Sequence, residues 1–294
     1  MMAKEIRVRA PVRVDLAGGW SDCAPFTHDH GGEVINFAID QYIEAVMRID
    51  DSGKLSVEYH SDGPTSSGLG TSGALNVAFL AAISGDGRSP VEIAELAFQF
   101  EALLGNRGGR QDQWAAANGG FQHLMFHGEN VEIMPFEPMP SATRWLQRQL
   151  VLAYTNISHT SGDIHEEIWQ RYVDGDETVH SALMTLRVMA RQVATALTSD
   201  RRDIFIDAIR AVSAAIDEMN PELNQAYRPV VDDLMADKDA LAWKGMGAAA
   251  GGTVAIIANN GKVDAVKSAC TNVGWEIIEW NYDDEGLQRQ VIET

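Results

Sequence analysis

The segment from Pro64 to Ala74 carries the residue types best suited to holding phosphate. It reads Pro-Thr-Ser-Ser-Gly-Leu-Gly-Thr-Ser-Gly-Ala and continues directly into the apolar segment 75–83. Gly68 and Gly70 lack a Cβ, so the backbone can turn tightly and approach a bulky anion. The apolar segment predicts a buried helix, whose first turn offers free N–H groups and the positive end of the helix dipole. Such a loop binds anions without a lysine, although the same pattern also fits an ordinary connection.

Two better-known phosphate motifs are excluded in this segment. A Walker A loop requires Gly-Lys-Ser or Gly-Lys-Thr after its spacer, and the dinucleotide-binding fingerprint requires Gly-x-Gly-x-x-Gly after a strand. Neither pattern occurs between Pro64 and Ala74.

Charged residues near the N-terminus form a second candidate site. The alternation in residues 6–16 predicts a strand, which places Arg13 and Asp15 on the same face. A turn with two glycines follows, and Trp20 and Asp22 then offer a flat apolar surface and a hydroxyl acceptor, a combination that suits a sugar. The alternative is an edge strand with a surface salt bridge and a Trp20 side chain in the core.

Two acidic residues farther along the chain are further candidates. Ser89-Pro-Val-Glu is a strong helix start, and the helix is expected to run to about Leu104. Glu101 then lies in the last turn, where the helix dipole disfavours a carboxylate. It is a candidate metal ligand or a surface residue. Asp112 follows in a polar stretch, 105–113, that we expect to be flexible. Beside a cation it would orient a hydroxyl rather than act as a strong base.

His28 and His30 invite a metal interpretation, but a zinc site needs three or four ligands fixed in space. We expect a loop before the next strand instead.

The sequence predicts an α+β protein with two lobes. The proline-rich segment 135–140 predicts a stiff boundary, which gives an N-terminal domain of residues 1–140 and a C-terminal domain of residues 141–294. In the second half, a strand over 150–154, helices to about residue 235, a strand over 254–258, a helix over 263–270 and a strand over 275–280 predict helices on one face of a sheet. A second small-residue loop occupies 244–253.

Composition limits the classes of partner. The chain has 42 acidic and 23 basic residues and a net charge of −19, which argues against nucleic-acid binding. No uncharged run is long enough to span a bilayer, so no membrane partner is expected. Two cysteines, Cys23 and Cys270, indicate a reducing compartment, and we expect a cytoplasmic protein.

Three segments together resemble the GHMP kinases, the family of galactokinase, homoserine, mevalonate and phosphomevalonate kinases. They are Ala10-Pro-Val-Arg-Val-Asp-Leu-Ala-Gly-Gly-Trp-Ser-Asp22, Gly68-Leu-Gly-Thr-Ser-Gly-Ala74 and Gly247-Ala-Ala-Ala-Gly-Gly252, in the family's order. Gly-Gly-Trp-Ser-Asp and Gly-Gly-Arg-Gln-Asp-Gln look most like the sugar kinase branch that contains L-fucose kinase and D-glycero-D-manno-heptose 7-phosphate kinase.

The resemblance implies a two-lobed fold, with an N-terminal lobe like domain 2 of ribosomal protein S5 and a ferredoxin-like C-terminal lobe. It also implies ATP and Mg²⁺ as cofactors and assigns residues to four groups. Asp112 would be catalytic with Arg13 beside it, and the metal would be bound by Thr71 or Ser72, of which we take Ser72, together with Glu101. The nucleotide would be held by Pro64, Ser66, Ser67, Gly68, Leu69, Gly70, Thr71, Ser72, Gly73, Gly247 and Ala248. The acceptor would contact Trp20, Ser21, Asp22, Gly109 and Gln111.

The sequence departs from the family pattern in two places. Thr71 stands where serine is usual and Gly73 where alanine is usual, which leaves the choice of metal-binding hydroxyl open. Residues 248–250 are alanines where glycines are commoner, so the backbone turn there can differ.

We therefore expect a kinase that transfers the γ-phosphate of ATP to a hydroxyl of a sugar or sugar phosphate. The alternatives are a non-sugar acceptor such as mevalonate, inositol or an amino acid, and a silent regulator that binds nucleotide and sugar. Arg107 and Arg110 are candidates for gripping a phosphate on the acceptor, and equally for holding ATP. The sequence leaves homodimer formation open.

Overall fold

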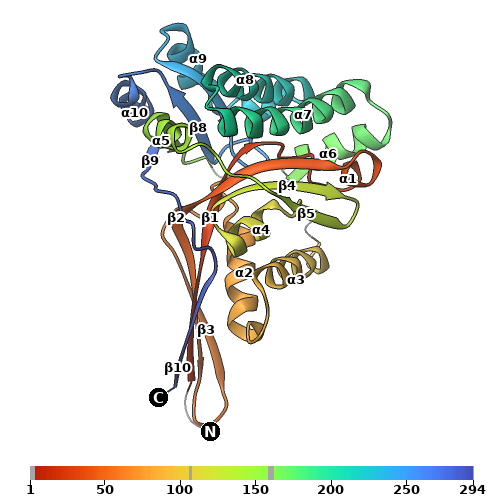
Figure 1. Ribbon diagram of the computed structural model, residues 1–294, viewed down its shortest axis with the longest axis vertical. Helices are drawn as coiled ribbons and strands as arrows, with labels where there is room; N and C mark the ends of the chain where they lie inside the picture. The colour runs from red at the N-terminus through yellow and green to blue at the C-terminus, as the bar shows by residue number, and fades with distance from the viewer. Residues whose placement is uncertain (1–3, 106–107, 158–161, 294) are drawn as a thin grey trace.

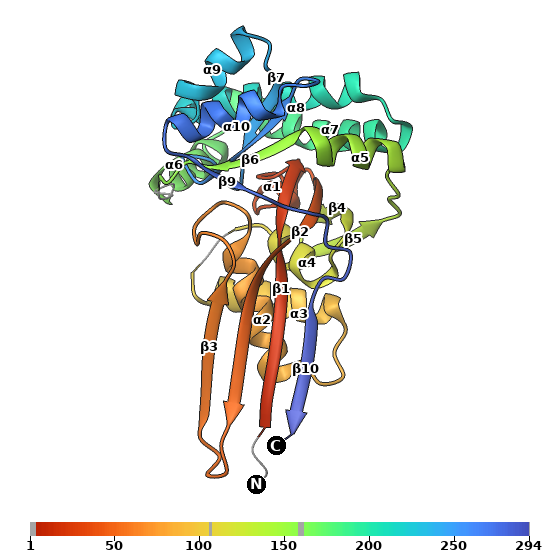
Figure 2. The same cartoon turned by 90° about the vertical axis from the view of Figure 1, so that its left-hand side faces the viewer.

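The computed structural model describes residues 4–105, 108–157 and 162–293, and its strands form two separate antiparallel sheets (Figure 1). The larger, six-stranded sheet has the order β10-β1-β2-β4-β5, with β3 also paired to β2. Its strands are β1 (Lys4–Ala17), β2 (Gly32–Ile49), β3 (Leu55–Ser61), β4 (Phe121–His127), β5 (Asn130–Met134) and β10 (Gln288–Glu293). The strands β3, β2, β1 and β10 extend side by side away from the rest of the molecule (Figure 2).

Four helices belong to the part of the chain that forms the larger sheet. They are α1 (Phe26–Asp29), α2 (Thr71–Ser84), α3 (Pro90–Leu103) and α4 (Gln111–Asn118). Helices α2 and α4 pack against β1 and β2, and α3 packs against both helices. This arrangement brings the start of α2 and the start of α4 toward the same strand, β1.

The smaller sheet has four strands in the order β7-β8-β6-β9. Along the chain, β6 is followed by helices, β7, β8, one helix and β9, which is the βαββαβ order of a ferredoxin-like lobe. Its elements are α5 (Pro140–Gln149), β6 (Leu150–Tyr154), α6 (Gly162–Val173), α7 (Glu177–Ser199), α8 (Arg202–Met219), a 3-10 turn (Pro221–Asn224), α9 (Arg228–Ala236), β7 (Ala240–Gly245), β8 (Thr253–Ala258), α10 (Val263–Asn272) and β9 (Glu276–Ile278).

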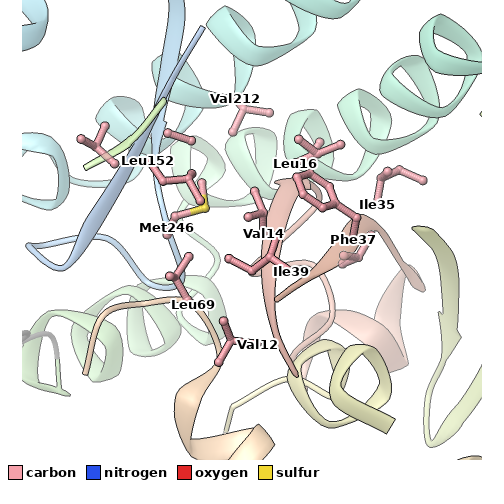
Figure 3. Close-up of a cluster of buried hydrophobic side chains, with 14 of the residues drawn as sticks. Val12, Val14, Leu16, Ile35, Phe37, Ile39, Leu69, Leu152, Val212 and Met246 are labelled. Carbon is pink, nitrogen blue, oxygen red and sulfur yellow. The ribbon is translucent and has the colours of Figure 1, made fainter. Parts of the chain in front are cut away.

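Burial along β1 changes from one half of the strand to the other. Residues 5–8 alternate between more and less buried positions, whereas every residue from Ala10 to Ala17 is buried. Both faces of this second half are therefore covered, as in strands enclosed between two layers. Figure 3 shows Val12, Val14 and Leu16 in one apolar cluster with residues of both lobes, among them Leu152, Val212 and Met246. The two lobes share a continuous core, and Arg13 and Asp15 of β1 lie inside it.

Several predicted elements are confirmed closely. The strand predicted over 150–154 is β6, and the helix predicted after Ser89 is α3, with Pro90 at its first position. The side-chain oxygen of Ser89 accepts from the backbone N–H of Glu92, and the Glu92 carboxylate accepts from the backbone N–H of Ser89. Both reciprocal bonds of the predicted capping box are present.

Other predictions need correction. Residues 111–118 form the helix α4 rather than the end of a flexible stretch, because Trp114 and the three alanines after it are buried. Helix α5 starts at Pro140, the last residue of the predicted linker, and was not anticipated. The strand β10 returns from the end of the chain to pair with β1, so residues 288–293 belong to the larger sheet. Among the described residues, no helix is long and apolar enough to span a bilayer.

The capping box gives a first prediction. Ser89→Ala removes the acceptor for the Glu92 N–H, and we expect the free energy of unfolding in urea to fall by about 1 kcal/mol. Ser268→Ala is the matched control, because Ser268 is exposed within α10 rather than at its start. Alanine has the higher helix propensity there, so stability should stay level or rise by at most about 0.5 kcal/mol. Equal effects of the two substitutions would contradict the role of the cap.

Candidate active site

A buried arginine joins the glycine-rich loop to the predicted catalytic aspartate. The Nε atom of Arg13 donates to Oδ1 of Asp112 over 2.8 Å, and its Nη2 atom lies 2.6 Å from the same oxygen. The Nη1 atom donates to the carbonyl oxygen of Gly68 over 2.6 Å. Arg13 is 3% exposed, whereas a quarter of the Asp112 side chain, 25%, faces solvent. The carboxylate is thus held on its inner side and remains accessible to a ligand on the other.

The start of α2 lies directly against Asp112. Gly70 is the residue before the helix and has a φ of 77°. A Cβ added to Gly70 would lie 3.1 Å from Cγ of Asp112, and one added to Gly73 would lie 2.6 Å from its Cβ. The loop and Asp112, which are about forty residues apart in the sequence, therefore lie directly against each other. The approach also explains Gly73, since an alanine methyl would occupy the space of the Asp112 side chain.

The second small-residue loop packs on the first through backbone contacts. A Cβ on Gly68 would meet the carbonyl oxygen of Met246 at 2.7 Å, and one on Gly252 would meet that of Ser67 at 2.7 Å. The backbone N–H of Thr253 donates to the Ser67 carbonyl over 2.8 Å. Only residues without side chains allow this approach. Gly247 borders the loop in the same way, since a Cβ on it would lie 3.0 Å from the carbonyl oxygen of Gly68, and Ala248 follows it in the chain.

Alanines take the place of glycines in this second loop at a conformational cost. Ala249 and Ala250 have φ values of 62° and 60°. The left-handed region costs a non-glycine residue roughly 1–2 kcal/mol. Ala249 is 2% exposed and belongs to the core, which offsets part of that cost.

A pocket next to the loop combines residues of both lobes. Pro64, Ser67, Leu69 and Thr71 line it together with residues that the sequence analysis missed, of which the main ones are Tyr42 of β2 and Ile278 of β9. An aromatic ring and an aliphatic side chain from the two sheets thus border the glycine-rich loop. Ser66 lies beside it, exposed and with a φ of 59°. No local pattern marks Tyr42 or Ile278, because only the packing of the two sheets brings them to the loop.

Glu101 lies under the first turns of α2. It is 6% exposed, and its Oε1 atom accepts a hydrogen bond from Nδ2 of Asn76 over 2.8 Å. The same amide nitrogen is 3.1 Å from the backbone oxygen of Ser72. Asn76 was missed, although it is the one polar residue in an apolar run and lies four positions after Ser72.

These residues fit Mg²⁺ by the type of their oxygen atoms. Within the described ranges, no group of three or more His, Cys, Asp or Glu side chains is arranged to hold a metal ion. Mg²⁺ commonly uses only one or two carboxylates and takes its other ligands from substrate phosphates and water. A Ser72 hydroxyl and a Glu101 carboxylate near a phosphate loop match that requirement.

The structure brings three of the predicted acceptor residues together, namely Asp22, Gly109 and Gln111. Oδ2 of Asp22 accepts from the backbone N–H of Gln111 over 3.3 Å, and a Cβ on Gly109 would overlap with the same oxygen. The structure corrects the prediction that Ser21 contacts the acceptor. Its hydroxyl is fully buried and donates to the carbonyl oxygen of Gly18 over 2.7 Å. It also accepts from the backbone N–H of Glu33, so it holds the turn rather than facing a ligand.

Trp20 is 5% exposed and lies at the boundary between the lobes. Its ring stacks on His165 of α6 with a centroid distance of 4.7 Å, and the ring of Trp169 is 6.1 Å away. His165 and Trp169 were not singled out from the sequence. Trp20 has a φ of 77°, a strained conformation that the surrounding turn must enforce.

Burial has a strong effect on Asp22. Desolvation, followed by the nearby charge of Asp112, raises the pKa of Asp22 to about 7. The carboxylate is 3% exposed. Asp22 can therefore donate as well as accept a hydrogen bond near neutral pH.

Arg110 is engaged with protein groups rather than oriented toward the site. It forms ion pairs with Glu95, over 3.2 Å, and with Glu129, and its guanidinium carbon lies 3.8 Å from the centroid of the Phe98 ring. The prediction that it grips a phosphate is therefore not supported. Arg107 lies outside the described residues.

The two histidines near the start of the chain, His28 and His30, each lie beside another side chain. Nε2 of His28 lies 3.0 Å from Glu129, and the Nε2 atoms of His30 and His180 are 2.8 Å apart.

Comparison with known proteins supports the family resemblance. Residues 35–120 match the N-terminal domain of the GHMP kinases, and the fold is shared with solved members over nearly the whole chain. The chain is therefore similar to the GHMP kinases over nearly its whole length. GHMP kinases are phosphotransferases that act on alcohol groups. One solved structure, a D-glycero-D-manno-heptose 1-phosphate kinase from Bacteroides thetaiotaomicron, has a TM-score of 0.78 at 20% identity and covers 98% of this chain and 100% of its own.

Three relatives illustrate the range of acceptors. The D-glycero-alpha-D-manno-heptose 7-phosphate kinase of Campylobacter jejuni is 25% identical, over 97% of this chain and 98% of its own length. The bifunctional fucokinase/GDP-fucose pyrophosphorylase of Arabidopsis thaliana is 24% identical over 87% of this chain, which corresponds to 30% of that protein. The mevalonate kinase of Thermococcus onnurineus is 27% identical, over 90% of this chain and 78% of its own.

The contact between Gly73 and Asp112 gives a second prediction. Gly73→Ala would place a methyl group 2.6 Å from Cβ of Asp112 and 3.1 Å from its backbone carbon, so α2 and α4 must move apart. We expect the free energy of unfolding in urea to fall by about 1–3 kcal/mol. Gly63→Ala is the control, because its methyl would meet only the flexible side-chain oxygen of Gln41, at 3.3 Å. Similar losses at both positions would contradict the tight approach of α2 and α4.

The pKa of Asp22 gives a third prediction. The pKa is raised in the folded state from 3.8 to about 7, so the native protein holds this proton more tightly than the unfolded chain. The contribution of Asp22 to stability therefore falls as pH rises from about 4 to about 7. Asp22→Asn should gain stability relative to wild type over that range, by at most about 4 kcal/mol, and level off above it.

The measurement is urea unfolding at several pH values between 5 and 8. Asp203→Asn is the control, since an Arg201 partner lowers the pKa of Asp203 to about 2 and its effect on stability should be constant over this range. A difference between Asp22→Asn and wild type that does not change with pH would contradict the raised pKa.

Proposed function

We propose that the protein is an ATP-dependent kinase that transfers the γ-phosphate of ATP to a hydroxyl of a sugar or sugar phosphate, with a fucose-like or heptose 7-phosphate-like acceptor. The observation that carries this proposal is the position of Asp112, held by Arg13 at the start of α2. A hydroxyl bound at Asp112 would be close to a phosphate bound at the loop. The heptose kinase and fucokinase relatives support the class of acceptor.

The chemistry that this arrangement supports is mainly positioning. Phosphoryl transfer has a loose, charge-rich transition state, so alignment and electrostatic stabilisation contribute most of the catalysis. In our proposal, Oδ2 of Asp112 accepts a hydrogen bond from the acceptor hydroxyl while Arg13 fixes Oδ1. The hydroxyl oxygen attacks the γ-phosphorus, the bond to the β-phosphate oxygen breaks, ADP leaves, and the hydroxyl proton passes to Asp112 or solvent.

Nucleotide and metal would be held at the start of α2. We assign the backbone N–H groups of residues 68–73 to the phosphates. Ser72 and Glu101 would hold Mg²⁺, which neutralises phosphate charge when it is bound. We prefer Ser72 to Thr71 because Asn76 links the backbone of Ser72 to Glu101, whereas Thr71 lines the pocket on the other side.

The alternatives are a non-sugar acceptor and a silent regulator. Trp20 and the buried polar side chains around it favour a ligand with both a flat face and several hydroxyls, which mevalonate lacks. A regulator would not need Arg13, Asp112, Ser72 and Glu101 together. We also propose a role in carbohydrate metabolism in the cytoplasm, where the two free, buried cysteines would stay reduced.

An ADP-release assay over free and phosphorylated hexoses and heptoses, with mevalonate, inositol and threonine included, tests the acceptor class. We expect turnover with a sugar or sugar phosphate and none with the other three compounds. Turnover with mevalonate, inositol or threonine alone would establish the rival acceptor class, and ATP binding without any turnover would establish the regulator.

Asp112 gives the fourth prediction. Asp112→Asn keeps the size of the side chain but weakens its capacity to accept the hydroxyl proton and its attraction to Arg13. We expect kcat to fall by about 1,000-fold or more while the KM for ATP changes by less than about threefold, because the interaction exists mainly in the transition state. Asp203→Asn on α8 is the control and should leave both constants within about twofold. A kcat of Asp112→Asn within about tenfold of wild type would rule out the assignment.

A further inference from the structure

A buried ion pair joins the two lobes beside the catalytic arginine. The Nζ atom of Lys244, on β7, donates to the backbone oxygen of Asp15 over 2.7 Å and to its Oδ2 atom over 2.8 Å. Lys244 is 6% exposed and Asp15 is 1% exposed. Asp15 lies two residues after Arg13 on β1, so the pair is close to the phosphate-transfer site without being part of the steps proposed above.

The hydrogen-bonding capacity of this pair is only partly used. The Oδ1 atom of Asp15 is buried and has no partner among the residues that the structure describes. An ammonium group has three protons, and the two hydrogen bonds of Lys244 to Asp15 account for two of them. A buried carboxylate oxygen without a partner is costly, and a buried ion pair often adds little to stability over an apolar pair. Burial also lowers the pKa of Lys244, which opposes retention of its charge for stability alone.

The free capacity of the pair faces a small pocket between the lobes. Asp15 and Lys244 line this pocket together with Gly19 and Trp20, and the pocket has room for about one water-sized group. The indole Nε1 atom of Trp20 is also buried and without a partner in the described chain. A space of this size and polarity suits one hydroxyl group rather than a sugar ring.

A second contact connects the pair to the predicted acceptor residues. A Cβ on Gly19 would lie 2.3 Å from Oδ2 of Asp15 and 3.2 Å from Nε2 of Gln111, so both polar groups border the same side of the turn. The Oε1 atom of Gln111 is buried and, within the described residues, unpartnered. The backbone N–H of Gln111 in turn donates to Asp22. Gln111 thus contacts Asp22, borders the same turn as Asp15, and directly precedes Asp112 in the chain.

We propose that Asp15 and Lys244 form the polar end of the acceptor site and recognise one hydroxyl group of the acceptor, distinct from the hydroxyl that is phosphorylated. The hydroxyl would donate to Oδ1 of Asp15 and accept from the remaining N–H of Lys244. This inference rests on the proposed sugar kinase function. Since the two side chains come from different lobes, an acceptor bound in this way would also hold the lobes together around Asp112.

The test compares single and double variants by steady-state kinetics. The probes are D-glycero-D-manno-heptose 7-phosphate and L-fucose, each with its monodeoxy analogues. Asp15→Asn and Lys244→Met should each raise the KM for the acceptor by about 30-fold or more and change the KM for ATP by less than about threefold. Wild type should discriminate by at least about 30-fold against one monodeoxy analogue, whereas Asp15→Asn should treat that analogue and its parent alike to within about threefold.

The double variant separates recognition from structural support. Each single variant leaves one buried charge unpaired and can lower the unfolding temperature, whereas Asp15→Asn with Lys244→Met removes both charges. We expect the double variant to recover most of the unfolding temperature while the KM for the acceptor stays raised. Recovery of the acceptor KM in the double variant would overturn the inference and leave the pair a structural link or a water site.

Arg191→Gln is the matched control, since it breaks another bond between the lobes, a 2.6 Å ion pair to Glu33, away from the pocket. It should leave both KM values within about threefold of wild type. A similar rise in the acceptor KM for Arg191→Gln would also overturn the inference. If wild type releases ADP with no sugar, the proposed function fails as well. If wild type is active and the variants at Asp15 and Lys244 match it, only this inference fails.

Discussion

The buried guanidinium of Arg13 is the interaction on which the rest of the site depends. It contacts Asp112 at the start of α4 and the carbonyl of Gly68 in the loop, while its own backbone N–H donates to Leu69 over 2.9 Å. One side chain therefore fixes the distance between a carboxylate and a phosphate-binding loop. The cation is possible at this depth because a carboxylate and a carbonyl satisfy it. The enclosed second half of β1 holds Arg13 in place, and Arg13 in turn holds Asp112 and the Gly68 carbonyl.

The contact between the lobes imposes a second constraint, which concerns backbone rather than side chains. Gly68, Gly247 and Gly252 lie where backbones approach within the space of a methyl group. Interlobe packing of this kind leaves little room for relative movement at the loop. The charged and aromatic groups that line the acceptor side, such as Trp20 and Lys244, come from both lobes and are joined by side chains instead. In the proposed kinase, backbone contacts would hold the nucleotide side and side-chain contacts would hold the acceptor side.

The sequence predicted local features better than contacts between distant segments. The capping box at Ser89, the strand 150–154 and the unusual position of Glu101 depend on neighbours within a few residues, and the structure contains all three. Tyr42, Ile278 and Lys244 could not be found in this way, because sheet pairing and lobe packing bring them to the site. Ser21 shows the opposite error. Its type and place suit a ligand contact, but the hydroxyl is used by the backbone of its own turn and of β2.

The net charge of the protein is −19, so its total charge repels a polyanionic ligand such as ATP. The local field matters more than the total, because surface charges are screened over about 8–10 Å at physiological ionic strength. The first turn of α2 contains no acidic residue, and the positive end of its dipole points at the loop. Arg13 adds a full positive charge behind the loop, and Glu101 supplies a carboxylate only where a divalent cation would offset it. Phosphate binding at the loop would therefore depend on this local field rather than on the total charge.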